Sequence, residues 1–260
     1  MRDMEITFLG TGTSHGIPVI GCDCAVCQST DPRDKRLRTA ILVRTPECVF
    51  AIDTPPDFRT QALRECITHL DAVLYTHSHS DHILGFDDLR RFCEVGDCAI
   101  PIYGSQQTLA DIKRVFAYAF DESPKYRNYV RPEAHEIEGA FDLGATRIVP
   151  LPLPHGRRMT TGYVLWRGGR KLLAYMTDCH EVPEAAREAA CGAEVLVLDA
   201  LRHTPHPTHM SVGQALEVIA EVRPQKTYFI HMCHDLGHAE TEANLPQNIR
   251  LSYDGLRISI

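Results

Sequence analysis

Short apolar runs that end in polar or glycine-rich turns recur along this chain, and they predict a fold rich in buried strands. The clearest run, 70–75, is mostly apolar and gives way at once to a polar segment. Similar runs predict strands at 5–10, 38–43, 48–53, 100–104, 146–153, 161–166, 171–176, 193–200 and 226–231. We expect a last run, 250–258, to close the sheet.

Helical patterns lie between these runs. Apolar residues spaced three or four apart predict helices at 60–66, 108–116 and 212–222. Strands that alternate with helices indicate an α/β fold. A length of 260 residues suits one large domain, 1–260, with a sizeable core.

Composition narrows the class of protein. No apolar run approaches the length of a membrane span, and the first five residues do not resemble a signal peptide, so we expect no membrane contact. The formal charge of -7 argues against a broad nucleic-acid surface, although a local basic patch can hide within that sum. Ten cysteines without an export signal indicate a reducing, cytoplasmic setting.

The polar segment after the 70–75 run carries the densest chemistry of the chain. It reads His77-Ser78-His79-Ser80-Asp81-His82, and it follows a predicted strand, where α/β folds place their sites. Four such ligands cannot all reach one tetrahedral ion. We therefore expect His77 and His79 to share one metal, with Asp81 and His82 turned toward a second. Imidazole and carboxylate suit zinc, iron or manganese. The alternative is a histidine-rich surface loop.

A second motif lies in the loop 21–27. Cys22, Cys24 and Cys27 have the C-x-C-x-x-C spacing that can close on one tetrahedral ion, which predicts a structural zinc. The fourth ligand must come from elsewhere in the chain. A redox switch and reduced cysteines without metal are the alternatives.

The sequence allows a functional and a purely structural interpretation for each of two further segments. The glycine-rich turn 10–16 lacks the spacing of a dinucleotide fingerprint, and its His15 either faces a substrate phosphate or is a plain loop residue. The segment 105–135 combines a helical run with tyrosines and basic residues, including Lys125 and Arg127. It is either a lid over the site or a surface excursion whose aromatic side chains pack on the body.

The H-x-H-x-D-H motif, together with the cysteine spacing, resembles the metallo-β-lactamase fold superfamily of metallohydrolases. Within it, the chain is most similar to the PhnP-like phosphodiesterases of the carbon–phosphorus lyase pathway, which are related to tRNA 3′-processing endonucleases. The resemblance covers nearly the whole chain. It implies an αββα sandwich, in which two mixed β-sheets are flanked by helices and the metal site lies at one sheet edge.

The resemblance also implies a role for individual residues. Two catalytic divalent ions, zinc or manganese with iron as a further option, would be held by His77, His79 and His155 (first ion), by Asp81, His82 and His231 (second ion), and by a bridging Asp178. Cys179 is the alternative to Asp178, because some lactamases use a cysteine nearby. Asp53 would support the metal-binding loop from behind its ligands. His234 would complete the structural zinc site. His209 would contact the scissile phosphate, with His203 and His206 as alternatives.

These residues predict hydrolysis of a phosphodiester. A water between two divalent ions is deprotonated near neutral pH and attacks phosphorus, while His209 stabilises the transition state or protonates the leaving alkoxide. Asp81 is the other candidate base, but coordination would leave it a weak proton acceptor.

The expected substrate is a small, cyclic sugar phosphodiester of the phosphoribosyl 1,2-cyclic phosphate type. Three alternatives stay open, namely an RNA 3′-processing endonuclease of the tRNase Z type, hydrolysis of a thioester or lactam, and a catalytically silent metal-binding accessory protein. The acidic balance and the lack of a long Gly- and basic-rich arm argue against RNA. A homodimer is left open.

Overall fold

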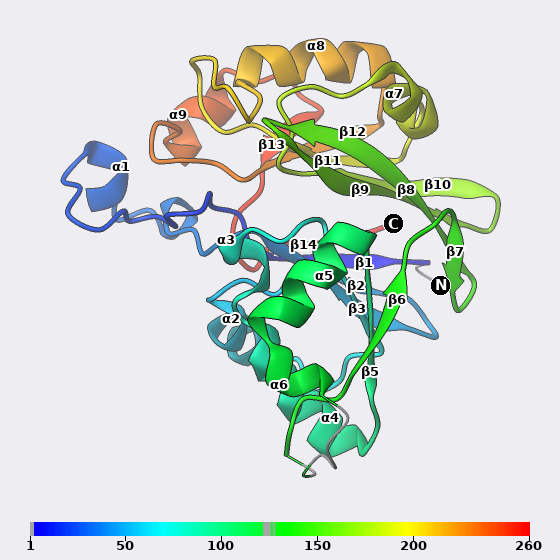
Figure 1. Ribbon diagram of the computed structural model, residues 1–260. Coiled ribbons are helices and arrows are strands. Elements are labelled where there is room, and N and C mark those ends of the chain that lie inside the picture. The colour runs from blue at the N-terminus through cyan, green and yellow to red at the C-terminus, as the bar shows by residue number, and fades with distance from the viewer. Residues whose placement is uncertain (1–2, 122–125, 127) are drawn as a thin grey trace.

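Two seven-stranded mixed sheets face each other, and helices cover the outer face of each (Figure 1). The computed structural model describes residues 3–121, 126 and 128–260. The predicted αββα sandwich is therefore confirmed. Both termini lie beside each other at the first sheet, where the Asp3 and Met4 amides donate to the Ile260 carbonyl.

The first sheet has the strand order β14-β1-β2-β3-β4-β5-β6. Its strands are β1 (Glu5–Gly10), β2 (Ala40–Arg44), β3 (Val49–Ile52), β4 (Ala72–Leu74), β5 (Ile100–Gly104), β6 (Pro132–Glu136) and β14 (Arg257–Ser259). The second sheet has the order β13-β12-β11-β10-β9-β8-β7. Its strands are β7 (Phe141–Leu143), β8 (Thr146–His155), β9 (Arg158–Arg167), β10 (Arg170–Met176), β11 (Val195–Asp199), β12 (Lys226–Ile230) and β13 (Ile249–Leu251).

The helices form two outer layers (Figure 1). The first sheet is covered by α2 (Phe58–Arg64), α3 (Ser80–Ile83), α4 (Arg90–Gly96), α5 (Gln106–Val115) and α6 (Ala117–Phe120). The second is covered by α7 (Glu184–Ala190), α8 (Val212–Val222) and α9 (His238–Ala243). The short α1 (Ala25–Gln28) projects from the body on a long loop. Among the described helices, none combines the length and apolar character that a membrane crossing requires.

The core has three apolar layers, because each sheet is buried on both faces. Phe8, Phe50 and Tyr175 belong to the layer between the sheets. Outer layers lie under the helices, with Phe58 and Ile112 beneath those of the first sheet. This burial explains why most strands appear in the sequence as nearly continuous apolar runs.

The parallel strands fix the place of the functional residues. In the first sheet β3 to β6 are parallel, and in the second β10 to β13 are parallel. Polar loops follow β4 in the first sheet and β10 in the second, and they meet where His82 lies 3.3 Å from Asp178. We expected the metal site at one sheet edge. That expectation is wrong, because the candidate metal ligands lie where strands of both sheets end.

The expected closing strand at 250–258 is also wrong. Two short strands stand in its place, and they belong to different sheets, with β13 parallel to β12 and β14 antiparallel to β1. Between them Ser252 donates its amide to the Phe229 carbonyl, and Gly255 turns the chain with a φ of 89°. The apolar spacing of 250–258 does not reveal this crossing from one sheet to the other.

The segment 105–135 contains α5, α6 and β6. Of its described aromatic rings, Phe116 and Phe120 pack on the body, where they stack on Phe86 at 4.6 and 5.9 Å, whereas Tyr118, Tyr126 and Tyr129 are exposed. Ile112 of α5 is buried in the core. Residues 122–125 and 127, which include the basic pair Lys125 and Arg127, lie outside the described residues.

Candidate metal centre

The H-x-H-x-D-H loop leaves the buried strand β4 and turns into the short helix α3. His77 and His79 precede this helix, whereas Asp81 and His82 lie in its first turn. Two backbone hydrogen bonds fasten the loop to the segment after β3, from the Thr54 amide to the His82 carbonyl and from the Gly85 amide to the Thr54 carbonyl, each 2.9 Å long. The loop is thus held from behind by the first sheet.

The structure brings all seven predicted catalytic ligands together in two adjacent groups. Within each group the potential ligand atoms lie within 4.8 Å of one another. The groups are His77, His79 and His155, and Asp81, His82, Asp178 and His231. Asp178 lies between them, because its carboxylate oxygens are 3.8 Å from His77 Nε2, 3.3 Å from His82 Nε2 and 3.2 Å from His231 Nε2.

Buried nitrogen atoms without partners show that these groups fit divalent cations. In the described part of the chain, the Nε2 atoms of His77, His82 and His231 are buried and have no hydrogen-bond partner. A buried polar atom left unpaired costs about 1–3 kcal/mol, so such a cluster needs a ligand. Imidazole nitrogen beside carboxylate oxygen is the donor set of zinc, manganese or iron.

Hydrogen bonds and burial prepare the imidazoles for coordination. His82 Nδ1 lies 2.7 Å from Asp53, and His155 Nδ1 lies 2.8 Å from the Thr208 carbonyl, so in both rings Nδ1 donates and Nε2 keeps its lone pair. Burial lowers the pKa of His77 well below its usual value, and burial also lowers the pKa of His79 and His155. Neutral imidazole is the form that binds a metal.

Asp53 lies behind the candidate ligands. Its buried carboxylate accepts hydrogen bonds from the Thr76 amide and hydroxyl, both 2.8 Å long, besides the bond to His82. Asp53, Asp178 and His231 all follow strands and all have left-handed backbone, with φ of 67°, 53° and 61°. Such angles are uncommon for residues other than glycine and concentrate at functional sites.

Cys179 has the opposite orientation to its neighbour Asp178. Its side chain is buried in the apolar cluster under α7 and α8, and burial raises the pKa of its thiol well above the usual value. It belongs to none of the candidate metal groups found in the described residues. The structure therefore favours the carboxylate over the thiol at this position.

His209 is the histidine that the loop before α8 presents to the metal groups. One of its ring nitrogens lies within 4.8 Å of ligand atoms of His155 and Asp178. His206 is half-buried at the mouth of the site, and His203 is exposed and lines neither of the cavities described below. Of the three predicted alternatives, His209 is thus the best placed.

Asp199, the last residue of β11, was missed by the sequence analysis. It is fully buried, and its Oδ2 lies 2.7 Å from His209 Nδ1 and 3.0 Å from the Cys179 amide. Burial opposes a charge on His209, but the Asp199 carboxylate raises the pKa of His209 to about 9. The only sequence signal for Asp199 is a carboxylate that closes an apolar strand, and such a residue can equally be a turn cap.

The cysteine loop and His234 form a separate group of four ligands. The Sγ atoms of Cys22, Cys24 and Cys27 lie 3.2, 3.5 and 3.5 Å from His234 Nδ1. Hydrogen bonding from the Cys27 amide lowers the pKa of Cys24 to about 7, which favours the thiolate that zinc needs. His231 and His234 lie on one short loop, so this group is tied directly to the catalytic one.

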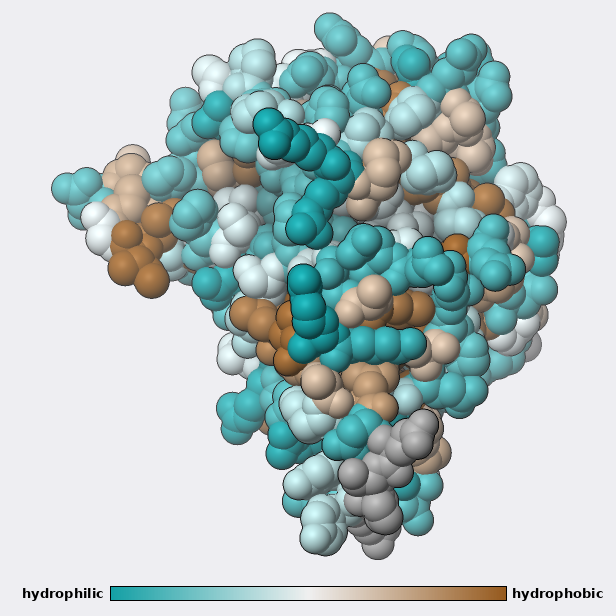
Figure 2. Space-filling model, viewed as in Figure 1, coloured by the Kyte–Doolittle hydropathy of each residue, from teal (hydrophilic) through white to brown (hydrophobic). Residues whose placement is uncertain are grey.

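Two connected cavities open onto these residues. One, of about 440 Å³, is lined by His79, Asp81, Asp178 and His231 of the metal groups, by Arg157 of the β8–β9 turn and by Arg158, the first residue of β9. The other, of about 460 Å³, is lined by His15, Arg202 and His234 and shares His206 and His209 with the first. Figure 2 shows that this face of the molecule is mostly hydrophilic.

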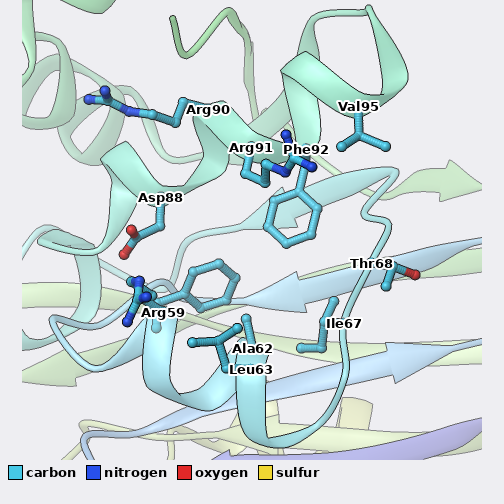
Figure 3. Close-up of a pocket in the computed structure, with 11 residues that line it drawn as sticks. Arg59, Ala62, Leu63, Ile67, Thr68, Asp88, Arg90, Arg91, Phe92 and Val95 are labelled. Carbon is cyan, nitrogen blue, oxygen red and sulfur yellow. The ribbon is translucent and has the colours of Figure 1, made fainter. Parts of the chain in front are cut away.

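A larger apolar groove, of about 550 Å³, lies elsewhere, between α2 and α4 (Figure 3). Phe92 and Leu63 line it, and Arg59 lies beside Asp88 at one end. None of its lining residues belongs to the candidate metal groups, so we place the reaction in the smaller cavity.

Comparison with known proteins identifies the family. Residues 49–232 match the family described as the beta-lactamase superfamily domain. The chain belongs to the β-lactamase superfamily. A solved structure described as a new diphosphatase from the PhnP family is 42% identical, with a TM-score of 0.91 over 100% of this chain and 98% of that one. This superfamily member therefore also belongs to the PhnP family and is a metal-dependent hydrolase.

More distant superfamily structures share the fold. Zinc-bound PqqB from Methylobacterium extorquens is 19% identical, with a TM-score of 0.80 over 98% of this chain and 100% of that one. The short form of human tRNase Z is 19% identical, with a TM-score of 0.72 over 98% and 99%. A Porphyromonas gingivalis protein named octanoyltransferase is 36% identical over 99% of this chain but 52% of its own length. The chain thus spans about half the length of that curated relative.

Proposed function

We propose that this hydrolase is a phosphodiesterase that cleaves a small organic phosphodiester, with a cyclic sugar phosphate as the preferred type of substrate. The observation that carries the proposal is the His209–Asp199 pair, which opens onto the same cavity as both candidate metal groups. Hydrolysis of a P–O bond needs charge neutralisation on phosphorus and a proton for the leaving oxygen, and this cavity offers groups for both.

The metal-binding roles follow from the two groups of ligands. His77, His79 and His155 would hold one divalent ion, Asp81, His82 and His231 a second, and Asp178 would contact both. When bound, such an ion pair neutralises phosphoryl charge and lowers the pKa of water. We assign Asp81 to coordination rather than to proton transfer, because the imidazoles of His82 and His231 hold its pKa low against the effect of burial.

The proton donor is His209. Its Nδ1 proton is held by Asp199, so Nε2 is the nitrogen that faces a substrate. Water gives one proton to solvent and adds its oxygen to phosphorus, the bond from phosphorus to the leaving oxygen breaks, and His209 Nε2–H protonates that oxygen and later regains its proton from solvent. Arg157 and Arg158 line the cavity and add positive charge for a phosphate, although Arg158 is also 3.5 Å from the Asp111 carboxylate.

Two other reactions are weaker candidates. Hydrolysis of a diphosphate is favoured by the description of the 42% identical PhnP-family relative, and it would use the same residues. RNA processing is supported only by fold likeness to the human tRNase Z and yeast RNase Z structures, at 19% and 12% identity. The octanoyltransferase name belongs to a protein about twice as long, so it assigns no activity to the shared half.

Metal content and turnover measured together test the proposal. The wild type, purified without chelator, should hydrolyse bis(p-nitrophenyl) phosphate, and His77→Ala should lose bound catalytic metal and turnover while its circular dichroism spectrum is kept. His135→Ala is the control, because His135 stacks on Tyr103 at 4.9 Å and belongs to no candidate metal group of the described residues. Full turnover by His77→Ala without catalytic metal would overturn the assignment.

A further inference from the structure

Arg158 enters the metal-lined cavity from the same hairpin that supplies His155. The two residues are directly paired in the register of β8 and β9, and only Gly156 and Arg157 separate them along the chain. Because the side chains of a cross-strand pair lie on the same face of a sheet, Arg158 and His155 share one side of the hairpin. The side chain of Arg158 is 55% exposed, so its guanidinium is accessible from the cavity that it lines.

Asp111 connects this arginine to the ligand loop. It lies on α5, and its Oδ2 accepts from Ser78 Oγ at 2.7 Å and lies 3.5 Å from Arg158 Nη1. Ser78 is the residue between His77 and His79, and its Oγ lies 3.4 Å from the same Nη1. One carboxylate from the helices of the first sheet thus contacts both the metal-binding loop and an arginine of the second sheet.

The Asp111 carboxylate is itself fixed and charged. Its Oδ1 accepts from Arg114 Nη2 at 2.9 Å, so both of its oxygens have donors. The hydrogen bond from Ser78, against the effect of burial, lowers the pKa of Asp111. Two neighbours on the same helix, Leu109 and Ile112, are buried in the core beneath the helices of the first sheet. Asp111 is therefore a negative charge held beside the site on a well-packed helix.

Arg158 keeps donors for a ligand. Its contacts to Ser78 and Asp111 both use Nη1 and are long, at 3.4 and 3.5 Å. Its Nε and Nη2 have no acceptor among the residues that the structure describes. A guanidinium has five N–H groups in a planar fork, and two of them can bind two phosphoryl oxygens at once. The contacts to Asp111 and Ser78 thus orient the guanidinium without occupying the edge that a phosphate would use.

We propose that Arg158 binds the non-bridging oxygens of the phosphorus under attack, and that Asp111 is the positioning residue that orients it. The inference rests on the proposed function and adds a residue for charge stabilisation to the metal ligands and the proton donor. Hydrolysis converts a diester with one negative charge into a monoester that carries close to two. A guanidinium beside the phosphorus therefore stabilises the transition state more than the substrate. The segment 105–135 reaches the site through Asp111.

The first test separates charge stabilisation from proton donation. Arg158→Met should keep both catalytic metals and lower kcat/KM by about ten-fold or more, the range for a charge-assisted hydrogen bond. The factor should be the same on bis(p-nitrophenyl) phosphate and on adenosine 2′,3′-cyclic phosphate, because the charge on phosphorus does not depend on the leaving group. Arg158→Lys should restore part of the loss. Unchanged kcat/KM of Arg158→Met on both substrates would overturn the role of Arg158.

A double-mutant cycle tests the positioning residue. Asp111→Asn keeps an acceptor for Ser78 but removes the charge, so it should lower the kcat/KM of the wild type by about two-fold or more, with no further loss in the Arg158→Met background. Arg114→Met is the matched control, because it removes the other arginine of the same carboxylate and its side chain is 77% exposed. This control should keep the kcat/KM of the wild type.

Two outcomes of the cycle would overturn the positioning role. If Asp111→Asn lowered kcat/KM by the same factor in both backgrounds, Asp111 would act through the ligand loop and not through Arg158. If Arg114→Met lost as much activity as Asp111→Asn, the effect would come from α5 as a whole. Metal content and thermal unfolding of each variant are measured beside the rates.

A binding measurement makes the test of Arg158 independent of turnover. Calorimetry should show that inorganic phosphate binds the metal-loaded wild type at least about ten-fold more tightly than it binds metal-loaded Arg158→Met. Equal affinity of the two proteins would overturn the role of Arg158 even if no diester were hydrolysed. Failure of the wild type to hydrolyse any diester, with the difference in phosphate affinity present, would instead overturn the proposed function and leave phosphate binding by Arg158 standing.

Discussion

Asp53, Asp178 and His231 show how single residues build this centre. Each follows a strand and adopts left-handed backbone, which costs an L residue roughly 1–3 kcal/mol. The turn lets Asp178 and His231 of the second sheet approach ligands of the first, whereas Asp53 supports the His82 loop within its own sheet. Asp178 gains in return its contacts to the His77, His82 and His231 imidazoles. Backbone strain and buried charge are therefore concentrated where the function is proposed.

The pH profile should report the His209–Asp199 pair. The imidazolium is present below its raised pKa of about 9 and is lost above it, so hydrolysis of a diester with an alkoxide leaving group should fall as pH rises through this region. Bound divalent cations repel the positive charge of the imidazolium. The alkaline limb of the profile, where the rate falls, should therefore lie at or below pH 9. Asp199→Asn removes the carboxylate charge, so we expect the limb to move to lower pH, toward the ordinary histidine value of ~6.5.

Leaving-group dependence separates proton donation from simple charge stabilisation. His209→Ala should keep both catalytic metals but lose roughly 10²–10⁴ in kcat on the alkoxide substrate. The loss should be smaller with p-nitrophenolate, which needs little protonation. Rates on both substrates, with His203→Ala as the unchanged control, provide the measurement. Equal losses on the two substrates would argue against a general acid.

At the scale of elements, the cysteine loop lies largely outside the core. The loop around α1 projects from the body (Figure 1), and the side chain of Ile20 is 98% exposed. Cys24→Ser should therefore remove about one zinc per chain and lower the melting temperature, because a bound structural zinc contributes folding free energy. Zinc analysis and thermal unfolding measure this, with exposed Cys66→Ser as the control.

The same measurement tests the fourth ligand. His234→Ala should lose the same zinc, since its Nδ1 is the atom that approaches all three sulfur atoms. The loop that carries His234 is held by buried Arg36, which donates to the Cys233 and Leu236 carbonyls at 3.0 and 2.6 Å. We therefore expect His234→Ala to keep its fold when the zinc is lost. A variant that keeps its full zinc content would show that His234 is not a ligand.

The ligand loop packs so closely on its neighbour that one position accepts only glycine. A Cβ at Gly85 would lie 2.1 Å from the Pro55 carbonyl oxygen and 2.7 Å from Phe58 Cβ. Gly85→Ala should therefore destabilise the protein by about 1–3 kcal/mol or more and weaken metal binding through α3. Denaturant unfolding measures the first effect. Gly139→Ala, where no atom lies within 4 Å of the added Cβ, should leave stability nearly unchanged.

The elements found from sequence were those with continuous apolar runs. Most strands of both sheets and the helix α8 were predicted within a few residues, because burial on both faces leaves an unmistakable apolar signal. The edge strand β6, Pro-Glu-Ala-His-Glu, was missed, since its side chains are half-buried or exposed. Asp199 was missed for another reason, because its role depends on His209, ten residues away, which only the fold places beside it.

At the scale of the molecule, the sandwich joins residues from distant parts of the chain. His77 and His155 come from different sheets, and Cys22 meets His234 across most of the sequence. Spacing alone predicted the local ligands, while the distant ones came from the family resemblance. The two sheets bring both sets together at their strand ends, so the centre depends on the packing of the whole domain.

Net charge sets the last prediction, which concerns substrate size. A formal charge of -7 gives no long-range attraction for a polyanion, and the metal-lined cavity of about 440 Å³ suits a small diester. We expect cyclic nucleotides to be cleaved much faster than a tRNA precursor at matched concentrations. The ratio of the two rates should change little between about 50 and 200 mM salt, because few phosphate contacts and few released counterions are involved.

The opposite pattern would identify an RNA enzyme. A nuclease that grips several phosphates loses affinity by about 10³–10⁵ over that range of salt, since each contact releases counterions. Steady-state rates on both substrates at two salt concentrations therefore decide between a small-molecule phosphodiesterase and an RNA nuclease. His77→Ala serves as the blank for contaminating nucleases. Efficient, salt-sensitive trimming of precursor tRNA beside negligible cleavage of small diesters would overturn the phosphodiesterase assignment. The fold likeness to tRNase Z would then extend to the reaction, and the basic residues Arg157, Arg158 and Arg202 would have to contact the RNA backbone.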